Sequence, residues 1–158
     1  MSAKGFTIPE EGRVVNLLTA IDVGGVAKTA DSFNMKNAAH ADIIIQSGVI
    51  GNTATITVYE NTDNAAGGET AIGFDYYLYG ASDDTPGTRQ TATSSGFATG
   101  TTSGSMYVIC LDASQLSDGS PYVSVKTSSA AAHMISMVAV LSGCRYVTPN
   151  DGGPTSLT

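Results

Sequence analysis

The stretch ADIIIQSGVIGNTATITVYE, residues 41–60, decides the fold. Its isoleucine run, Ile43–Ile45, is β-branched, and such side chains pack well on a pleated sheet. After a glycine-containing break, apolar and polar residues alternate, which predicts a strand with one buried face. The isoleucine run is apolar on both faces, which is typical of a strand that is covered on both sides. We therefore expect two paired strands, at about 41–47 and 53–60, with the first more central or covered by another subunit.

The same two patterns recur along the chain, separated by Gly-, Pro- and Ser-rich turns. They predict further strands at about 32–36, 72–79, 88–93, 105–111, 122–127 and 133–141. Residues 112–116 are expected to form one helical turn with Asp112 as its N-cap. About eight strands and no long helix predict an all-β fold, a two-sheet antiparallel sandwich that is most simply a jelly roll. The alternative is an immunoglobulin-like sandwich, whose antibody type requires a buried Trp, and this chain has no Trp.

The first 30 residues lack a regular period. Their large apolar side chains are Phe6, Ile8, Val14, Val15, Leu17 and Leu18, with Pro9 and Gly12 among them. Residues 14–21 are compatible with a short strand or a helical turn. We interpret residues 1–30 as an extended N-terminal arm that packs on a partner, residues 31–147 as the sandwich domain, and residues 148–158 as a short C-terminal tail. The expected domain is of ordinary size.

Charge is sparse. Only 13% of the 158 residues are charged, about half the usual fraction, and the formal net charge is −7. Seven Lys and Arg residues do not suffice for a strong basic patch, so we expect no nucleic-acid partner. Because no apolar run approaches the roughly 18 residues of a membrane helix, we expect no membrane partner. Residues 1–5 lead into no apolar signal region, so we expect synthesis in a cytoplasm.

The residues that carry chemistry form no recognisable catalytic set. His40 and His133 are the only histidines, and His133 begins an apolar strand, which favours a structural or interface role. Cys110 and Cys144 lie in or beside apolar strands and are expected to be buried thiols. Their spacing from the histidines matches no zinc motif. We therefore expect no catalytic residue, no metal and no cofactor, and hence no enzyme.

One possibility of metal binding remains open at this point. Asp63 with Asn64 and Glu69, or the pair Asp83–Asp84, offer oxygen ligands for calcium, although neither has the spacing of a known calcium loop. The paired carboxylates Glu10–Glu11 and Asp83–Asp84 lie in polar segments, where nothing drives their pKa values apart for acid and base roles.

Several segments, taken in order, resemble one group of virion proteins. They are RVVNLL at 13–18, SFNMKN at 32–37, IIIQSGV at 43–49, ATITVYE at 54–60, AIGFDYY at 71–77, MYVICLDASQLSDG at 106–119 and VAVLSGCRY at 138–146. The chain is similar, from about residue 5 to 147, to head decoration (cement) proteins that tailed phages encode close to the major capsid protein. The resemblance implies a β-sandwich that binds the outside of an assembled capsid, often as a trimer, with no catalytic residues.

We therefore expect a structural virion protein that binds the outer surface of the phage capsid and stabilises it. Its expected partners are the major capsid protein and itself as a homo-oligomer, most simply a trimer. The expected interface residues are Phe6, Ile8, Val14, Val15, Leu17, Leu18, His133, Ile135, Val138 and Val140. The alternative is a tail-fibre or baseplate sandwich that binds a receptor or a carbohydrate through Tyr76, Tyr77 and Tyr79.

Overall fold

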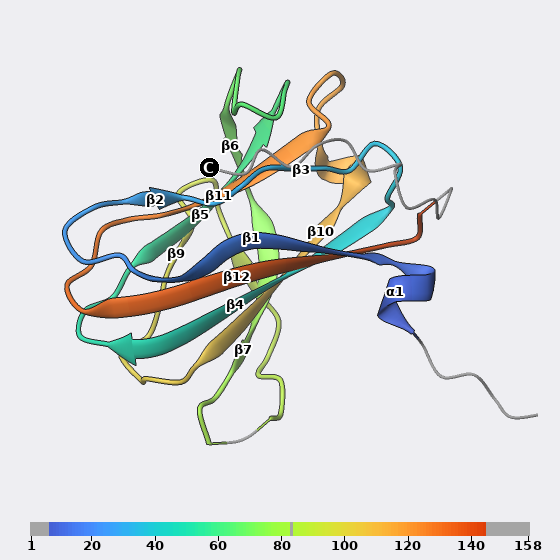
Figure 1. Ribbon diagram of the computed structural model, residues 1–158. Coiled ribbons are helices and arrows are strands. Elements are labelled where there is room, and N and C mark those ends of the chain that lie inside the picture. The colour runs from blue at the N-terminus through green and yellow to red at the C-terminus, as the bar shows by residue number, and fades with distance from the viewer. Residues whose placement is uncertain (1–6, 83, 145–158) are drawn as a thin grey trace, which may run out of the picture.

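A computed structural model describes residues 7–82 and 84–144, which form two antiparallel β-sheets packed face to face (Figure 1). Sheet A has the order β1 (Arg13–Asp22), β12 (His133–Ser142), β4 (His40–Ile50), β10 (Met106–Asp112), β7 (Phe74–Tyr79) and β8 (Gln90–Ala92). Sheet B has the order β2 (Lys28–Thr29), β11 (Tyr122–Thr127), β5 (Thr55–Asn61) and β6 (Thr70–Ile72), with β3 (Phe33–Asn34) beside β11 and β9 (Phe97–Ala98) beside β5.

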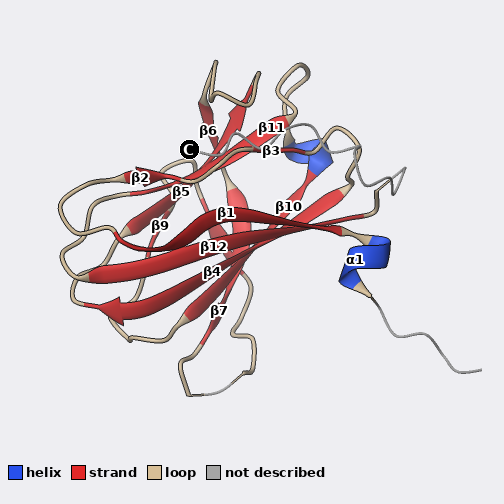
Figure 2. Ribbon diagram, viewed as in Figure 1, coloured by secondary structure: helices blue, strands red, loops and turns tan. Residues whose placement is uncertain are grey.

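Strands dominate the described chain (Figure 2). The helical elements are α1 (Ile8–Glu11) and η1 (Ala113–Gln115), so no long helix is present in the described ranges, as the sequence predicts. The all-β, two-sheet antiparallel sandwich is confirmed, with twelve strands in residues 7–82 and 84–144 rather than about eight. The number is higher partly because the expected strand at 72–79 is divided at Gly73: β6 belongs to sheet B and β7 to sheet A.

The core lies between the sheets and follows from strict alternation. In β12 the odd-numbered residues from His133 to Leu141 are buried, and the even-numbered residues point outward. In β4, Ile43 and Ile45 are fully buried, and Ile56 and Val58 of β5 meet them from the other sheet's inner face. Each such side chain contributes roughly 1.5–3 kcal/mol relative to an exposed one. The two inner faces together hold the sandwich closed.

The prediction that the strands of residues 41–60 pair with each other is wrong. β4 lies between β12 and β10 in sheet A, whereas β5 lies between β11 and β6 in sheet B. The turn between them crosses from one sheet to the other. The backbone N–H of Gly51 donates to Ala132 O at 2.8 Å, and a Cβ at Gly51 would lie 2.8 Å from Ala131 O. Glycine therefore permits this close crossing. β4 is an interior strand of sheet A, but β5 is likewise an interior strand of sheet B, so the first strand is not distinguished from the second by a central position.

The structure also corrects the expected N-terminal arm. Arg13–Asp22 is strand β1, which pairs with β12 at the edge of sheet A. Val15 and Leu17 are buried in the core at 5% and 2% exposure. The register shifts after Asn16 and again after Leu18, so bulges interrupt the alternation. A period-2 pattern broken in this way looks irregular in the sequence, although the segment is part of the sandwich.

Three expectations fall outside the described residues: the position of Phe6, the end of the sandwich domain at 147, and the C-terminal tail at 148–158. No helix in the described part of the chain is long and apolar enough to cross a membrane.

Candidate functional site

The outer face of sheet A, which points away from sheet B, carries an apolar surface. Ile44 of β4 lies opposite Val138 of β12 on one side and Val108 of β10 on the other. These side chains are half-buried by their neighbours within the sheet. Val140 and Val14 continue the surface toward β1, where Val14 is 52% exposed. We call the six residues Val14, Ile44, Met106, Val108, Val138 and Val140 the outer apolar band.

The outer apolar band is unusual for this position. An antiparallel sheet that packs on one side normally alternates apolar inside with polar outside, because water covers the other face. Here a central row, Val138, Ile44 and Val108, is apolar on the outside as well. Connected apolar surface of this kind marks sites where a protein contacts another protein. The strands expected at 41–47 and 133–141 are thus β4 and β12, and both carry apolar side chains on the inner and the outer face of sheet A.

The structure divides the expected interface residues into two groups. Val14, Val138 and Val140 lie in the outer apolar band, Leu18 is half-buried, and Ile8 lies half-buried in α1. The others that are described, Val15, Leu17, His133 and Ile135, are buried in the core and do not form a surface. The reason is parity. In β12 the residues at odd positions face sheet B, so His133 and Ile135 point away from the face that carries Val138.

His133 has a structural role. Its Nδ1 lies 3.1 Å from Asn52 O and its Nε2 lies 3.3 Å from Ser47 Oγ. Its backbone N–H donates to Asp22 Oδ1 at 3.1 Å. A fully buried imidazole needs such partners because an unpaired polar group in the interior is costly. The histidine therefore joins the start of β12 to β4 and to the end of β1.

The three tyrosines of the carbohydrate hypothesis do not share a face. Tyr76 stacks on Phe97 with ring centroids 4.1 Å apart and packs against the core. Its hydroxyl donates to Gln90 Oε1 at 2.7 Å. Tyr77 and Tyr79 point outward beside the outer apolar band, opposite Val108 and Met106 of β10. A three-tyrosine platform is therefore absent, and two tyrosines extend the outer surface.

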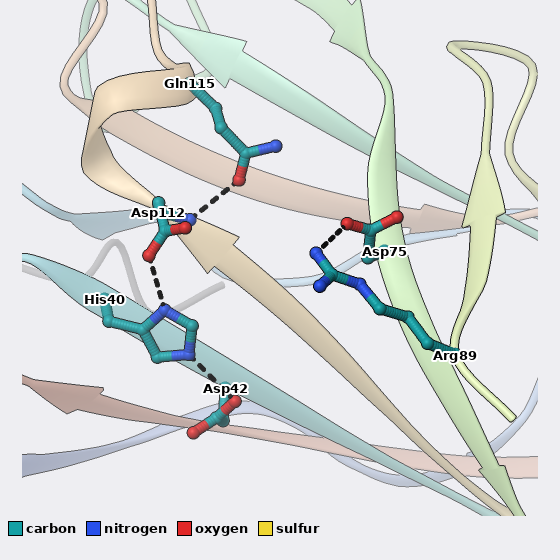
Figure 3. Close-up of polar contacts among 6 residues, drawn as sticks. All are labelled: His40, Asp42, Asp75, Arg89, Asp112 and Gln115. Atoms are coloured by element: carbon teal, nitrogen blue, oxygen red, sulfur yellow. Dashed lines mark hydrogen bonds and ion pairs between the residues drawn. The ribbon is translucent and has the colours of Figure 1, made fainter. Parts of the chain in front are cut away.

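A polar cluster borders the outer apolar band at the start of β4 (Figure 3). His40 lies between two carboxylates: Nδ1 is 2.8 Å from Asp112 Oδ1, and Nε2 is 3.1 Å from Asp42 Oδ1. Partial burial lowers the pKa of His40, but the hydrogen bonds to Asp112 and Asp42 outweigh it and hold the pKa above its ordinary value. The backbone N–H of Asp112 donates to Gln115 Oε1 at 2.8 Å, in the helical turn η1. The expected turn and its N-cap residue are thus both present.

Cys110 completes this cluster. It lies opposite Asp42 in the β4–β10 ladder, and the ligand atoms of His40, Asp42 and Cys110 all lie within 4.8 Å of one another. Burial, with Asp42 close by, raises the pKa of the Cys110 thiol to about 11. The thiol is therefore protonated at neutral pH, and the thiolate that acts as a nucleophile is scarce. A Cys–His nucleophilic pair is not supported by this environment.

Sequence reasoning missed this cluster because its members lie far apart in the chain. His40 and Asp112 are 72 positions apart. The sequence signal for this cluster is a pair of residues two positions apart in each of two strands. These are His40 and Asp42 in β4, and Cys110 and Asp112 in β10. Such spacing places both side chains on one face of each strand. The sequence offered no way to know that β4 and β10 are neighbours or in which register they pair.

The other carboxylates that were considered for calcium have local roles. Asp63 Oδ1 accepts hydrogen bonds from the backbone N–H groups of Ala65 and Gly67, both at 2.9 Å. Glu69 forms an ion pair with Lys126 of β11 at 2.5 Å. The first contacts close a turn, and the ion pair ties the residue before β6 to strand β11. Asp83 lies outside the described residues.

On the outer face of sheet A, Asp75 is held by the strand beside it. Thr91 Oγ1 donates to Asp75 Oδ1 at 2.5 Å. Arg89 forms an ion pair with the same carboxylate (Figure 3). These two hydrogen bonds, first that of Thr91, lower the pKa of Asp75. Asp75 therefore has a permanently charged partner in Arg89, whereas the partner of Asp42, His40, is cationic only when it is protonated.

Comparison of the chain with protein-family models, curated proteins and solved structures finds no match. No family is therefore assigned, and the site rests on its own geometry.

Proposed function

We propose that this protein is a structural virion protein of the head-decoration type, which binds the outer surface of a phage capsid and stabilises it. The observation that carries the proposal is the outer apolar band. A sandwich with its own closed core has no internal use for an apolar row on the far side of sheet A. Such a row gains free energy when another protein covers it. The identity of that protein as a capsid component is taken from the sequence resemblance.

The strand order supports a jelly roll as the detailed architecture. β1 pairs with β12, β2 and β3 with β11, β4 with β10, and β5 with β6, so the pairs are nested like those of one long antiparallel hairpin. Two further pairings, β4 with β12 and β5 with β11, wrap this hairpin upon itself. A jelly roll is a double-sheet fold of antiparallel strands wound in this manner.

The proposed partners are a second copy of the chain, most simply within a trimer, and the major capsid protein. Low charge favours such contacts, because neutral surface is easier to desolvate than charged surface. Many copies attached to one capsid lattice turn weak single contacts into strong total binding, since each link raises the effective concentration of the next. Charged residues flank the outer apolar band at Asp42 and Asp75 and lie at the rim, where they set orientation.

The alternative, a receptor- or carbohydrate-binding sandwich of a tail fibre or baseplate, has weaker support. It retains Tyr77 and Tyr79 beside Asp75 but loses Tyr76, which packs against Phe97. Quantified protein bands of purified virions separate the two functions. Hundreds of copies per particle support decoration, and a few to dozens support the tail.

The direct test is co-sedimentation with shells assembled from the major capsid protein. Val138→Asp places a charge in the outer apolar band and is expected to abolish sedimentation with shells and to reduce the mass measured by light scattering. Thr57→Asp is the matched control, because Thr57 lies half-buried in β5, where alternation points it to the outer face of sheet B. It introduces the same charge on the opposite side of the sandwich and is expected to bind as the parent protein does.

Two results would contradict the proposal. One is a folded Val138→Asp protein that sediments with shells and has unchanged mass. The other is equal loss of binding in both variants, which would show that charge anywhere on the surface, and not the outer apolar band, governs attachment.

A further inference from the structure

We propose that His40, Asp42 and Cys110 form a binding site for one zinc ion, with His40 Nε2, a carboxylate oxygen of Asp42 and Cys110 Sγ as ligands. This site is independent of the proposed capsid function. The three side chains come from two neighbouring strands of sheet A and converge on its outer face (Figure 3 shows His40 and Asp42).

The backbone brings the three ligands together without distortion. His40 and Asp42 are two residues apart in β4 and so share a face, and Cys110 lies directly opposite Asp42 in the adjacent strand β10. Their ligand atoms lie within 4.8 Å of one another, and His40 Nε2 is 3.1 Å from Asp42 Oδ1. Zinc bonds of about 2.0–2.3 Å at tetrahedral angles place ligand atoms roughly 3.3–3.8 Å apart. Small side-chain rotations therefore suffice to close the site.

The donor set points to zinc rather than to calcium or magnesium. Calcium and magnesium select oxygen ligands, whereas one sulfur, one imidazole nitrogen and one carboxylate oxygen suit a borderline cation such as zinc. Three protein ligands leave a fourth tetrahedral position, which water fills. The side chains of His40 and Asp42 are 32% and 40% exposed, so the ion reaches the site directly from solvent.

Asp112 supplies the outer support that zinc-bound histidines require. A ligating histidine normally donates its other ring N–H to a carboxylate, which fixes the tautomer and the ring orientation. Asp112 Oδ1 lies 2.8 Å from His40 Nδ1, and Gln115 holds the backbone of Asp112 in turn. In the neutral imidazole with its proton on Nδ1, Nε2 offers a lone pair to the metal. When zinc binds, the Cys110 S–H bond and, in any protonated His40, the Nε2–H bond break, Zn–S and Zn–N bonds form, and the released protons pass to the buffer.

The experiment is a titration of the untagged, reduced and chelator-treated protein, with Zn²⁺ followed by calorimetry and Co²⁺ followed by absorption. The expected result is saturation at one ion per chain and a sulfur-to-cobalt charge-transfer band. Cys110→Ser is expected to remove the charge-transfer band, and Cys110→Ser, His40→Gln and Asp42→Asn are each expected to remove saturable binding. Asp112→Asn is expected to retain the band with affinity lowered about 10–100-fold, as for other outer-shell partners.

Two variants serve as matched controls. Cys144→Ser removes the other thiol, and Asp75→Asn removes a carboxylate from the neighbouring strand β7 on the same face. Both are expected to bind as the parent does. Circular dichroism confirms that each variant is folded.

Three results would overturn the proposal. They are the absence of saturable binding by the folded parent protein, a charge-transfer band that survives Cys110→Ser but not Cys144→Ser, and equal weakening by Asp42→Asn and Asp75→Asn. The last result would indicate only general attraction of a cation to an acidic surface.

Discussion

Val138 of β12 and Ile44 of β4 lie directly opposite each other in the ladder of sheet A, and both side chains point away from the core. The residue before Val138 in β12, Met137, is fully buried on the inner face. Met137 therefore faces the interior of the sandwich, whereas its neighbour Val138 faces the outer surface of sheet A.

This relationship predicts opposite outcomes for the same substitution at adjacent positions. Val138→Asp is expected to keep a cooperative unfolding transition and to cost about 1 kcal/mol, the span of strand preferences at exposed sites. Met137→Asp buries a charge without a partner and is expected to abolish folding or to cost more than about 4 kcal/mol. Urea denaturation followed by circular dichroism measures both, and similar losses in the two variants would contradict the assigned faces.

Strand β1 is expected to be part of the stable fold. Leu17→Ala removes a side chain that is 2% exposed in the core, so we expect a loss of roughly 2–5 kcal/mol in the free energy of unfolding. Val14→Ala, at a 52% exposed position of the same strand, is the control and is expected to change it by about 0.5 kcal/mol or less. Deletion of residues 1–12, which stops before β1 begins, is expected to leave a cooperative melt. A Leu17→Ala protein as stable as the parent would show that residues 13–22 are an arm outside the stable core.

The contact between Glu60 and Ser117 is expected to stabilise the link between β5 and the loop after η1. The Glu60 side chain, 4% exposed, accepts hydrogen bonds from the Ser117 backbone N–H and hydroxyl, both at 2.7 Å. Hydrogen bonds to charged groups contribute about 1.5–3 kcal/mol, so Glu60→Ala is expected to lower stability by this order. Ser117→Ala removes the hydroxyl bond but keeps the backbone one, and we expect a smaller loss. Equal stability of the parent and Glu60→Ala proteins in thermal melts would refute the contact.

His40 is expected to titrate above free imidazole in the chelator-treated protein. Asp42 and Asp112 face its ring, with Cys110 beside Asp42, and their hydrogen bonds outweigh the effect of burial. Because the folded-state pKa is raised, the contribution to stability is full below the unfolded pKa of 6.5 and is lost as pH rises through the folded-state pKa. Proton NMR of the His40 ring measures that pKa. Asp112→Asn is expected to lower it and to flatten the pH dependence of Tm above about pH 6.5, and an unchanged pKa in this variant would contradict the contact.

The thiol of Cys110 is expected to react slowly. Its pKa of about 11, against an ordinary 9.0, lowers the thiolate fraction at pH 8 roughly 10–100-fold. Alkylation of the metal-free protein by iodoacetamide, followed by mass spectrometry, is expected to be slower at Cys110 than in the unfolded chain by that factor. Both cysteines are free and half-buried, not fully buried as expected from the sequence, and reductant is expected to leave Tm unchanged. Rapid labelling of Cys110, or a Tm that falls on reduction, would disprove this description.

Part of the fold could be predicted from local pattern. The strand Tyr122–Thr127 begins and ends where its alternation predicts, and the turn after Asp112 is present where a capping residue precedes a polar segment. The two-sheet architecture also follows from many short alternating strands without a long helix. These features depend on side chains within a few residues of one another, so the sequence carries them directly.

Other features depend on which strands become neighbours. Residues 41–60 do not form a hairpin, because both strands pair with strands from the second half of the chain. β4 pairs with β10 and β12, and β5 pairs with β11. β1 could not be recognised from its period, because its bulges depend on pairing with β12. The outer apolar band could be predicted in part, because the sequence shows two strands that are apolar on both faces. His133 and Ile135 do not belong to the band, because odd-numbered residues of β12 face the core.

The sequence by itself determined that this chain is an all-β sandwich with little charge and with two strands apolar on both faces, since alternation and composition are local properties. The tertiary structure alone decided that Val138, Ile44 and Val108 form one row, and that His40, Asp42 and Cys110 converge on one point. Both results require the register between strands, because a shift of one residue turns every side chain to the opposite face. That register is set by burial of the whole core and not by any single segment.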